Sequence, residues 1–369
     1  MDSKIDKVAD ILVNYCAKVK KGDKVWITAN SPEADPWFKA VRVKVIQNGA
    51  FPYEHFMYDS QGEGMDRDWM EYASDAQLKT VSQIRVNEMK AMDAFIGIGS
   101  ASNTRYLAGM PPSRISLRKQ TLRKVMDERL KTRWVITRYP THAFAQEAGM
   151  STEEFSDFVY GSIIGIDWEK QKKMNERVKK IFDNAREVRI TGKETDLSFS
   201  LKGRTGRCDN GECNMPGGEV FYAPVHSSVR GHIKYSHPVI DSGNEIDGIY
   251  LEFDSRGRIS SVTAAKGEDF LQKMIATDDG AHFIGEFGIG NNAKIDRYIK
   301  NMLFDEKIGG TVHITPGAAY DDCVGPDDPY GINKSAIHWD IVKDLRKQAG
   351  GGKIMVNGKV VQKDGRWMF

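Results

Sequence analysis

The sequence predicts a two-domain protein, in which an α/β domain with a mostly parallel sheet precedes an α+β domain with an antiparallel sheet. Over residues 1–185, apolar runs typical of strands alternate with stretches of helical periodicity. Over residues 186–369, short alternating strands are separated by turn residues roughly every 8–12 positions. The length of 369 residues also fits two domains of roughly 100–200 residues each.

The first half begins with a helix, because Ile5, Val8 and Leu12 recur at helical spacing. Ser151 is typical of a residue that caps a helix N-terminus. Parallel strands joined by helices are covered on both faces, which accounts for the apolar runs. The predicted strands are 24–29, 53–57, 94–98 and 134–137, and the predicted helices are 5–18, 36–47, 112–130, 152–159 and 167–185.

Near residue 186 the pattern changes from alternating strands and helices to short strands separated by turns, and we place the domain boundary there. Asn357-Gly358 lies between alternating apolar residues, which favours a hairpin with a type I′ turn over residues 354–361. The other predicted strands are 196–202, 219–224, 230–235, 246–253 and 258–265, and the predicted helices are 269–277, 296–303 and 341–348.

Composition excludes several classes of protein. Lys and Arg total 53 against 51 for Asp and Glu, and no basic cluster indicates a nucleic-acid partner. No run approaches the roughly 18 apolar residues of a membrane span. The segment Met1–Asp6 lacks a signal-peptide pattern, and four cysteines are too few for a disulfide framework. We therefore expect a cytoplasmic protein.

Acidic and imidazole side chains stand on the polar faces of short strands in the last third. Successive side chains of a strand point to opposite faces, so His338 and Asp340 share one face while Trp339 takes the other. His313 likewise lies between two apolar neighbours, Val312 and Ile314. Strand geometry therefore makes His338 and Asp340 neighbours at one ion.

Two glutamates stand in glycine-rich, apolar surroundings. Glu286 lies in the run GEFG, and Glu219 follows Pro216-Gly217-Gly218. A buried carboxylate without a partner is costly, so a cation is a natural neighbour. Any one of these residues is more often structural, but the set of five has the ligand types of a divalent-metal site.

Four ordered motifs are similar to the signature of the thermophilic metallo-aminopeptidases of the M29 family, the aminopeptidase T and aminopeptidase S type. They are NMPGGEVFYAP (214–224), GEFGIGN (285–291), DEKIGGTVH (305–313) and NKSAIHWD (333–340). The motifs lie in residues 214–340, while the resemblance extends over nearly the whole chain. This sequence departs from the family pattern in the acidic loop 321–329, which concerns the mouth of the substrate site.

The resemblance implies a metal-dependent aminopeptidase that hydrolyses the N-terminal residue of peptides with a free N-terminus. Two divalent ions (zinc, cobalt or manganese) would activate the water. A homodimer is implied as well. Glu286 would also be a candidate general base, and Tyr320 would donate a hydrogen bond to the oxyanion. The implied metal ligands are Glu219, Glu286, His313, His338 and Asp340.

Two other functions are compatible with these residues. His313, His338 and Asp340 form a two-histidine, one-carboxylate set that suits a non-haem Fe(II) ring-cleaving dioxygenase, and dihydroxypyridine dioxygenases resemble this same fold. Such a site would not need Glu219 or Glu286, which favours the peptidase. A metal-free binding protein is the third reading, and it is disfavoured because no ligand position is lost.

Overall fold

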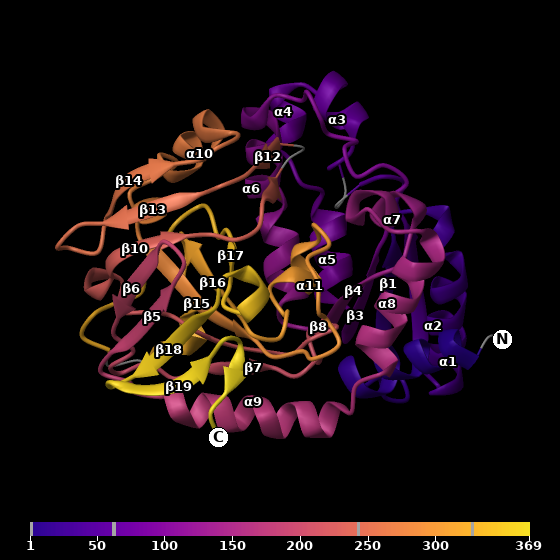
Figure 1. The fold of residues 1–369 in the computed structure, drawn as a ribbon. Helices are drawn as coiled ribbons and strands as arrows, with labels where there is room; N and C mark the ends of the chain where they lie inside the picture. Colours follow the sequence, from indigo (N-terminus) through magenta and orange to yellow (C-terminus); the bar gives the residue numbers. More distant parts are fainter. Residues whose placement is uncertain (1–2, 61–63, 242–243, 326–327) are drawn as a thin grey trace. The chain divides into compact units, whose positions relative to one another are not determined.

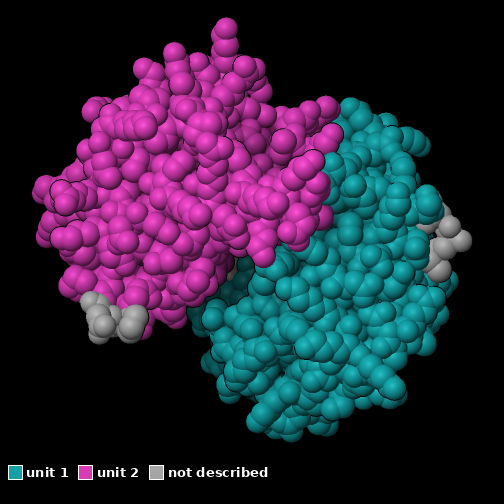
Figure 2. All heavy atoms as spheres, turned by 90° about the horizontal axis from the view of Figure 1, so that it is seen from below, with its two compact units in different colours: residues 1–166, 211–217 teal, residues 167–210, 218–369 magenta. Residues whose placement is uncertain are grey.

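The computed structural model describes residues 3–60, 64–241, 244–325 and 328–369. The chain forms two compact units, residues 1–166 with 211–217 and residues 167–210 with 218–369 (Figures 1 and 2). Two predictions include residues outside the described ranges: the N-terminal segment includes Met1 and Asp2, and the acidic loop includes Pro326 and Asp327. None of the helices in the described parts of the chain is both long and apolar enough to cross a bilayer.

The first unit is built on a five-stranded sheet whose neighbouring strands are all parallel. The parallel sheet predicted for the first half is therefore confirmed. One strand, β8, comes from the short segment 211–217, far along the chain. The order is β2 (Phe51–Phe56), β1 (Lys24–Ala29), β3 (Ala94–Gly99), β4 (Arg133–Arg138) and β8 (Asn214–Met215).

Helices cover this sheet on both faces. Five consecutive residues are therefore buried in each of β1 and β3. On one face Trp26 and Phe95 pack against Met89 of α5. Ser151 caps α8 as predicted, by accepting a hydrogen bond from the Glu154 N–H. The helices are α1 (Ser3–Asp10), its π-helical continuation η1 (Ile11–Cys16), η2 (Pro32–Ala34), α2 (Asp35–Gln47), α3 (Arg67–Tyr72), α4 (Asp75–Leu78), α5 (Gln83–Lys90), α6 (Pro112–Arg129), α7 (His142–Ala148) and α8 (Thr152–Ile164).

The second unit contains an eight-stranded antiparallel sheet and the small pair β11 (Val239–Asp241) and β12 (Asn244–Ile246). The predicted hairpin turn is confirmed, since Asn357 and Gly358 both have positive φ, 49° and 80°. The strand order is β14 (Ile259–Thr263), β13 (Tyr250–Phe253), β10 (Arg230–Lys234), β6 (Thr195–Phe199), β5 (Val188–Gly192), β18 (Gly352–Val356), β19 (Lys359–Lys363) and β20 (Arg366–Trp367).

A second antiparallel sheet of the same unit carries the candidate site. Its inner side chains share a hydrophobic core with the eight-stranded sheet, where the rings of Phe199 and Phe287 lie 4.9 Å apart. The strand order is β17 (Val342–Asp344), β16 (Thr311–Pro316), β15 (Ile284–Gly290), β9 (Glu219–Tyr222) and β7 (Arg207–Asp209).

Helix α9 (Trp168–Phe182) belongs to the second unit, whereas the boundary predicted near residue 186 includes it in the first domain. The ring of Phe182 packs on Phe287 of β15, with centroids 5.8 Å apart. The remaining helices of this unit are α10 (Glu268–Ile275), α11 (Met302–Asp305), η3 (His226–Ser228), η4 (Gly280–His282), η5 (Asp321–Cys323) and η6 (Lys347–Ala349).

Three local predictions are wrong. In place of the helix expected over 341–348, residues Val342–Asp344 form strand β17, because they pair with β16 in the sheet. The helix expected over 296–303 is limited to the single turn of α11. The strand expected over 246–253 is divided between β12 and β13, where Gly248 has a φ of 66° and the chain turns.

Candidate metal centre

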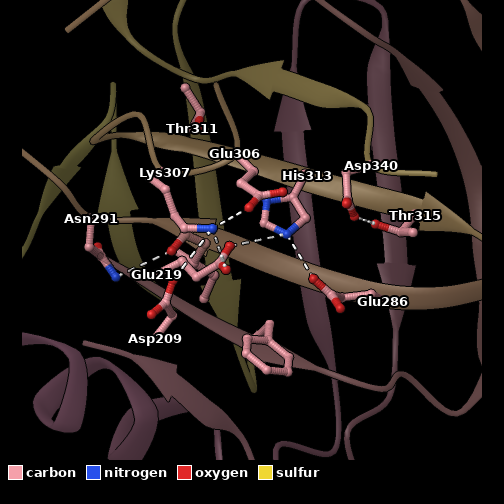
Figure 3. Close-up of polar contacts among 12 residues, drawn as sticks. Asp209, Glu219, Glu286, Asn291, Glu306, Lys307, Thr311, His313, Thr315 and Asp340 are labelled. Atoms are coloured by element: carbon pink, nitrogen blue, oxygen red, sulfur yellow. Dashed lines mark hydrogen bonds and ion pairs between the residues drawn. The ribbon is translucent and has the colours of Figure 1, made fainter. Parts of the chain in front are cut away.

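Three neighbouring strands bring acidic and imidazole side chains to one face of the second sheet. In β15 and β16, Phe287 and Val312 point into the core, so Glu286 and His313 point to the opposite face. In β9, the buried Val220 places Glu219 on that same face. The predicted alternation therefore brings the three ligand candidates together (Figure 3).

Glu219, Glu286 and His313 form the first group of potential metal ligands. The Nε2 atom of His313 lies 2.9 Å from Oε1 of Glu286 and 3.5 Å from Oε2 of Glu219. All three side chains are buried. Their ligand atoms lie within 4.8 Å of one another, which is close enough to share one ion.

Glu286, His338 and Asp340 form the second group. The Nε2 atom of His338 lies 3.4 Å from Oδ1 of Asp340 and 3.7 Å from Oε2 of Glu286. The segment carrying His338 and Asp340 is extended, and His338 forms an isolated antiparallel bridge with Gly317. Glu286 is common to both groups and presents one oxygen to each histidine.

Two hydrogen bonds orient the second group. The carbonyl of Ala318 lies 2.8 Å from Nδ1 of His338 and can only accept, so Nδ1 carries the proton and Nε2 is free to act as a ligand. The hydroxyl of Thr315 donates to Oδ1 of Asp340 at 2.6 Å. Both ligand side chains therefore have a fixed orientation toward Glu286.

The residues present fit a bound cation. Within the described residues, Oε2 of Glu219 and Oε2 of Glu286 are buried and have no hydrogen-bond partner. Buried polar atoms are nearly always paired, so two orphaned carboxylate oxygens in one cluster need a positive charge. Mixed imidazole and carboxylate donors suit borderline divalent metals such as zinc.

Charge in the cluster shifts the acid–base equilibria of its members. Burial alone would lower the pKa of His313, but the hydrogen bond to Glu286 and the charge of Glu219 raise it to about 9. Burial also opposes protonation of His338, whereas Asp340 and Glu286 raise its pKa to about 10. Burial raises the pKa of Glu219 to about 8, despite the nearby charge of Lys307. Without a metal, protons therefore supply part of the missing positive charge.

The family model for thermophilic metalloproteases (M29) matches residues 1–367. The chain belongs to the M29 metalloprotease family. Aminopeptidase 2 of Geobacillus stearothermophilus is 24% identical, with 99% of this chain and 95% of that protein covered. The solved structure of wild-type AmpT from Thermus thermophilus has a TM-score of 0.83 at 22% identity, with 99% of each chain covered. As a metalloprotease of this family, the protein requires a divalent metal.

The M29 fold is shared by an enzyme of another reaction class. The structure of 2,5-dihydroxypyridine dioxygenase from Pseudomonas putida KT2440 has a TM-score of 0.58 at 14% identity, covering 99% of this chain and 96% of that one. This likeness concerns the fold alone. The fold therefore does not separate the two chemistries, and the arrangement of the ligands has to do so.

Tyr320, the candidate oxyanion donor, immediately precedes η5 and lies beside the second ligand group. Its ring is 4.9 Å from that of His338 and 5.5 Å from that of Phe221, and half of its surface is exposed. Burial of the hydroxyl group, together with the negative charges of Glu286 and Asp340, raises the pKa of Tyr320 above its ordinary value. The hydroxyl therefore stays protonated at neutral pH and can donate.

Two arginines hold the described part of the acidic loop. Arg207 lies 3.2 Å from the exposed Asp322, and the buried Arg204 lies 3.4 Å from the buried Asp328. The loop charges are thus partly neutralised by Arg207, the first residue of β7, and by Arg204, which precedes this strand. These two ion pairs connect the acidic loop to the segment that leads into β7.

Sequence reasoning missed the lysine of this candidate site. Lys307 is fully buried, and its ammonium lies 2.9 Å from Oε1 of Glu219, 3.5 Å from Oδ2 of Asp209 and in contact with Glu306. Burial would lower the pKa of Lys307, but these three carboxylates raise it well above the ordinary value. The available signal was a lysine inside an otherwise apolar and acidic motif, DEKIGG.

Proposed function

We propose that this protein is an aminopeptidase that binds two divalent ions and uses them to remove the N-terminal residue of peptides. The observation that carries the proposal is the position of Glu286, whose carboxylate belongs to both ligand groups. The proposed ligands are Glu219, Glu286 and His313 for one ion, and Glu286, His338 and Asp340 for the other. A shared carboxylate suits a pair of neighbouring ions better than one mononuclear site.

The balance of charge supports two ions rather than one. The cluster contains five carboxylates and one ammonium, so its fixed charge is −4 when all carboxylates are ionised and both histidines are neutral. Two divalent ions would bring this charge to zero, whereas one would leave a buried excess of −2. The cluster members are Asp209, Glu219, Glu286, Glu306, Lys307 and Asp340.

The roles of the side chains follow from their places. The bound ions would activate a water molecule and polarise the scissile carbonyl. Glu286 lies between the two groups, and we propose it as the group that accepts the proton of that water. Tyr320 has a protonated hydroxyl beside His338 and would donate a hydrogen bond to the developing oxyanion.

Restriction to the N-terminal residue requires recognition of a free α-amino group. An ion or one of the clustered carboxylates would bind this amine, and Glu219 and Glu286 lie on the same face of the sheet. The substrates would thus be peptides with a free N-terminus. Imidazole and carboxylate donors together suit zinc, cobalt or manganese.

The ring-cleaving dioxygenase is the second candidate, because the fold is shared with such an enzyme. It requires His313, His338 and Asp340 to bind one iron. Among the described residues, however, the two potential ligand groups divide these histidines, one in each group, and both groups include Glu286. This arrangement favours the peptidase.

Metal analysis combined with a hydrolysis assay tests the proposal. Metal content per chain would be measured together with release of leucine from a leucyl amide, before and after chelation and re-addition of Zn²⁺, Co²⁺ or Mn²⁺. We expect close to two ions per chain and activity that is lost and regained. One iron per chain, with oxygen uptake on a hydroxylated pyridine and no amide hydrolysis, would establish the dioxygenase instead.

A matched control separates the site from general effects of removing a carboxylate. Asp340→Asn should lose an ion and most activity. Asp196→Asn removes an exposed carboxylate of β6 that pairs with Arg189 at 2.6 Å, and it should retain both properties. Equal loss in the two variants would argue against a metal site at Asp340.

We also propose a homodimer in the cytoplasm, which the resemblance to the aminopeptidase T and S type supports. Light scattering coupled to size-exclusion chromatography would give the mass in solution. A mass equal to one chain across the working concentration range would exclude the dimer, and cell fractionation would test the location.

A further inference from the structure

Lys307 is fully buried between two carboxylates that face each other across a strand pair. Asp209 of β7 and Glu219 of β9 are directly opposite in the antiparallel ladder. Like charges at directly opposed positions destabilise a sheet. The ammonium of Lys307 lies within ion-pair distance of both, at 3.5 Å and 2.9 Å (Figure 3).

The backbone brings Lys307 to this place by close approach to β15. Gly290 is paired with Glu219 across the sheet, and a Cβ atom at position 290 would collide with the carbonyl of Ile308 and approach Lys307. The Lys307 carbonyl also accepts a hydrogen bond of 3.0 Å from the Asn292 N–H. The backbone position of the lysine is therefore fixed by contacts with the main chain at Gly290 and Asn292.

The two oxygens of Glu219 have different surroundings. Oε1 accepts a hydrogen bond from Lys307 at 2.9 Å. Oε2 has no hydrogen-bond partner within the described residues and lies 3.5 Å from Nε2 of His313. One oxygen is thus held by the lysine, while the other is directed toward the first ligand group.

We infer that Lys307 is a positioning residue that holds Glu219 as a single-oxygen ligand for the ion of the first group. This inference rests on the proposed metal site. Because Lys307 contacts no member of the second group, its effect should be confined to one of the two ions. The lysine would also neutralise Asp209 and Glu306, so that their charges do not displace Glu219.

Co²⁺ binding to the metal-free, full-length protein tests this inference. Visible absorbance and calorimetry would report the two binding steps separately. Lys307→Met, which keeps the length of the side chain and removes its charge, should weaken one step about 10–100-fold and leave the other unchanged. Two unaltered binding steps in this variant would overturn the inference. If the wild-type chain bound no Co²⁺, the proposed function would fail with it.

A double-variant comparison shows whether Lys307 acts through Glu219. Glu219→Gln should weaken the same binding step. Adding Lys307→Met to Glu219→Gln should then cause little further loss, because the group that the lysine orients is already altered. Fully additive losses would mean that the lysine acts independently of Glu219 and would overturn the inference.

A third comparison separates positioning from stability. Lys307→Met leaves three carboxylates without their cation and should lower the melting temperature. Combining it with Asp209→Asn removes one of these charges and should restore part of the melting temperature without restoring Co²⁺ affinity. Asp196→Asn, which removes a carboxylate outside this cluster, is the control and should bind both ions at unchanged melting temperature. Affinity that returned together with stability would show a merely structural role for Lys307.

Discussion

His313 and Gly288 are directly opposite each other in the β15–β16 ladder, and the imidazole of His313 lies over the Gly288 backbone. A Cβ atom at position 288 would overlap the His313 ring at Nε2, the atom that faces Glu219 and Glu286. Glycine at position 288 is therefore what lets the histidine present this nitrogen to the first ligand group.

Gly288→Ala should displace His313 and so remove the ion of the first group. Misplacing a reacting group by about 1 Å can cost on the order of 100-fold in rate, and we expect at least that loss in kcat/KM. Metal content should fall toward one ion per chain. Gly161→Ala is a suitable control, because a Cβ there meets no atom within 4 Å in helix α8. Two ions and normal activity in Gly288→Ala would refute this role.

Tyr320→Phe should lower kcat while the metal content stays unchanged. The loss of one hydrogen-bond donor to an oxyanion typically reduces kcat by about 100–1000-fold. The ring contacts with His338 and Phe221 need no hydroxyl, so the local packing should persist. Steady-state kinetics with a leucyl amide, together with metal analysis, would check this. A normal kcat would exclude Tyr320 from oxyanion stabilisation.

Thr315→Val should weaken the ion of the second group, because Asp340 would lose the 2.6 Å hydrogen bond that orients it. Changes of this kind usually cost about 10–100-fold in metal affinity. Thr311→Val on the same strand face is the control, since the Thr311 hydroxyl donates to the Ile308 carbonyl and contacts no ligand candidate. Competition with a chromophoric chelator would measure both affinities, and equal losses would contradict the assignment.

The metal-free protein should lose stability as pH rises above neutrality. Folding raises the pKa of His313 to about 9 and of His338 to about 10, from an ordinary value of 6.5. The stabilisation from each raised histidine is complete below pH 6.5 and is lost as pH rises through the folded value. Glu219, raised to about 8, also favours its protonated form and acts in the same direction.

Urea unfolding of the metal-free chain at about pH 6 and about pH 9 would measure this dependence. The free energy of unfolding should be smaller at the higher pH. Since bound ions replace these protons, adding Zn²⁺ near neutral pH should release protons, which calorimetry in buffers of different ionisation enthalpy detects. Stability that increased over this range, or binding without proton release, would contradict the assignment of the charges.

Much of the candidate site could be predicted from local pattern. The alternation of His313 with Val312 and Ile314 fixes which face each side chain takes, because a strand has a period of two residues. The Asn357-Gly358 turn is determined locally too, since both residues adopt positive φ with little strain. These features depend only on neighbours in the sequence, so the sequence by itself determined them.

The tertiary structure decided which of these residues meet. Segment 341–348 has apolar spacing compatible with a helix, and only pairing with β16 makes Val342–Asp344 a strand. Likewise, the contact of Lys307 with Glu219 joins positions 88 residues apart, and the division of Glu286 between two histidines depends on strand register. Such contacts are set by the packing of distant segments, which no local periodicity encodes.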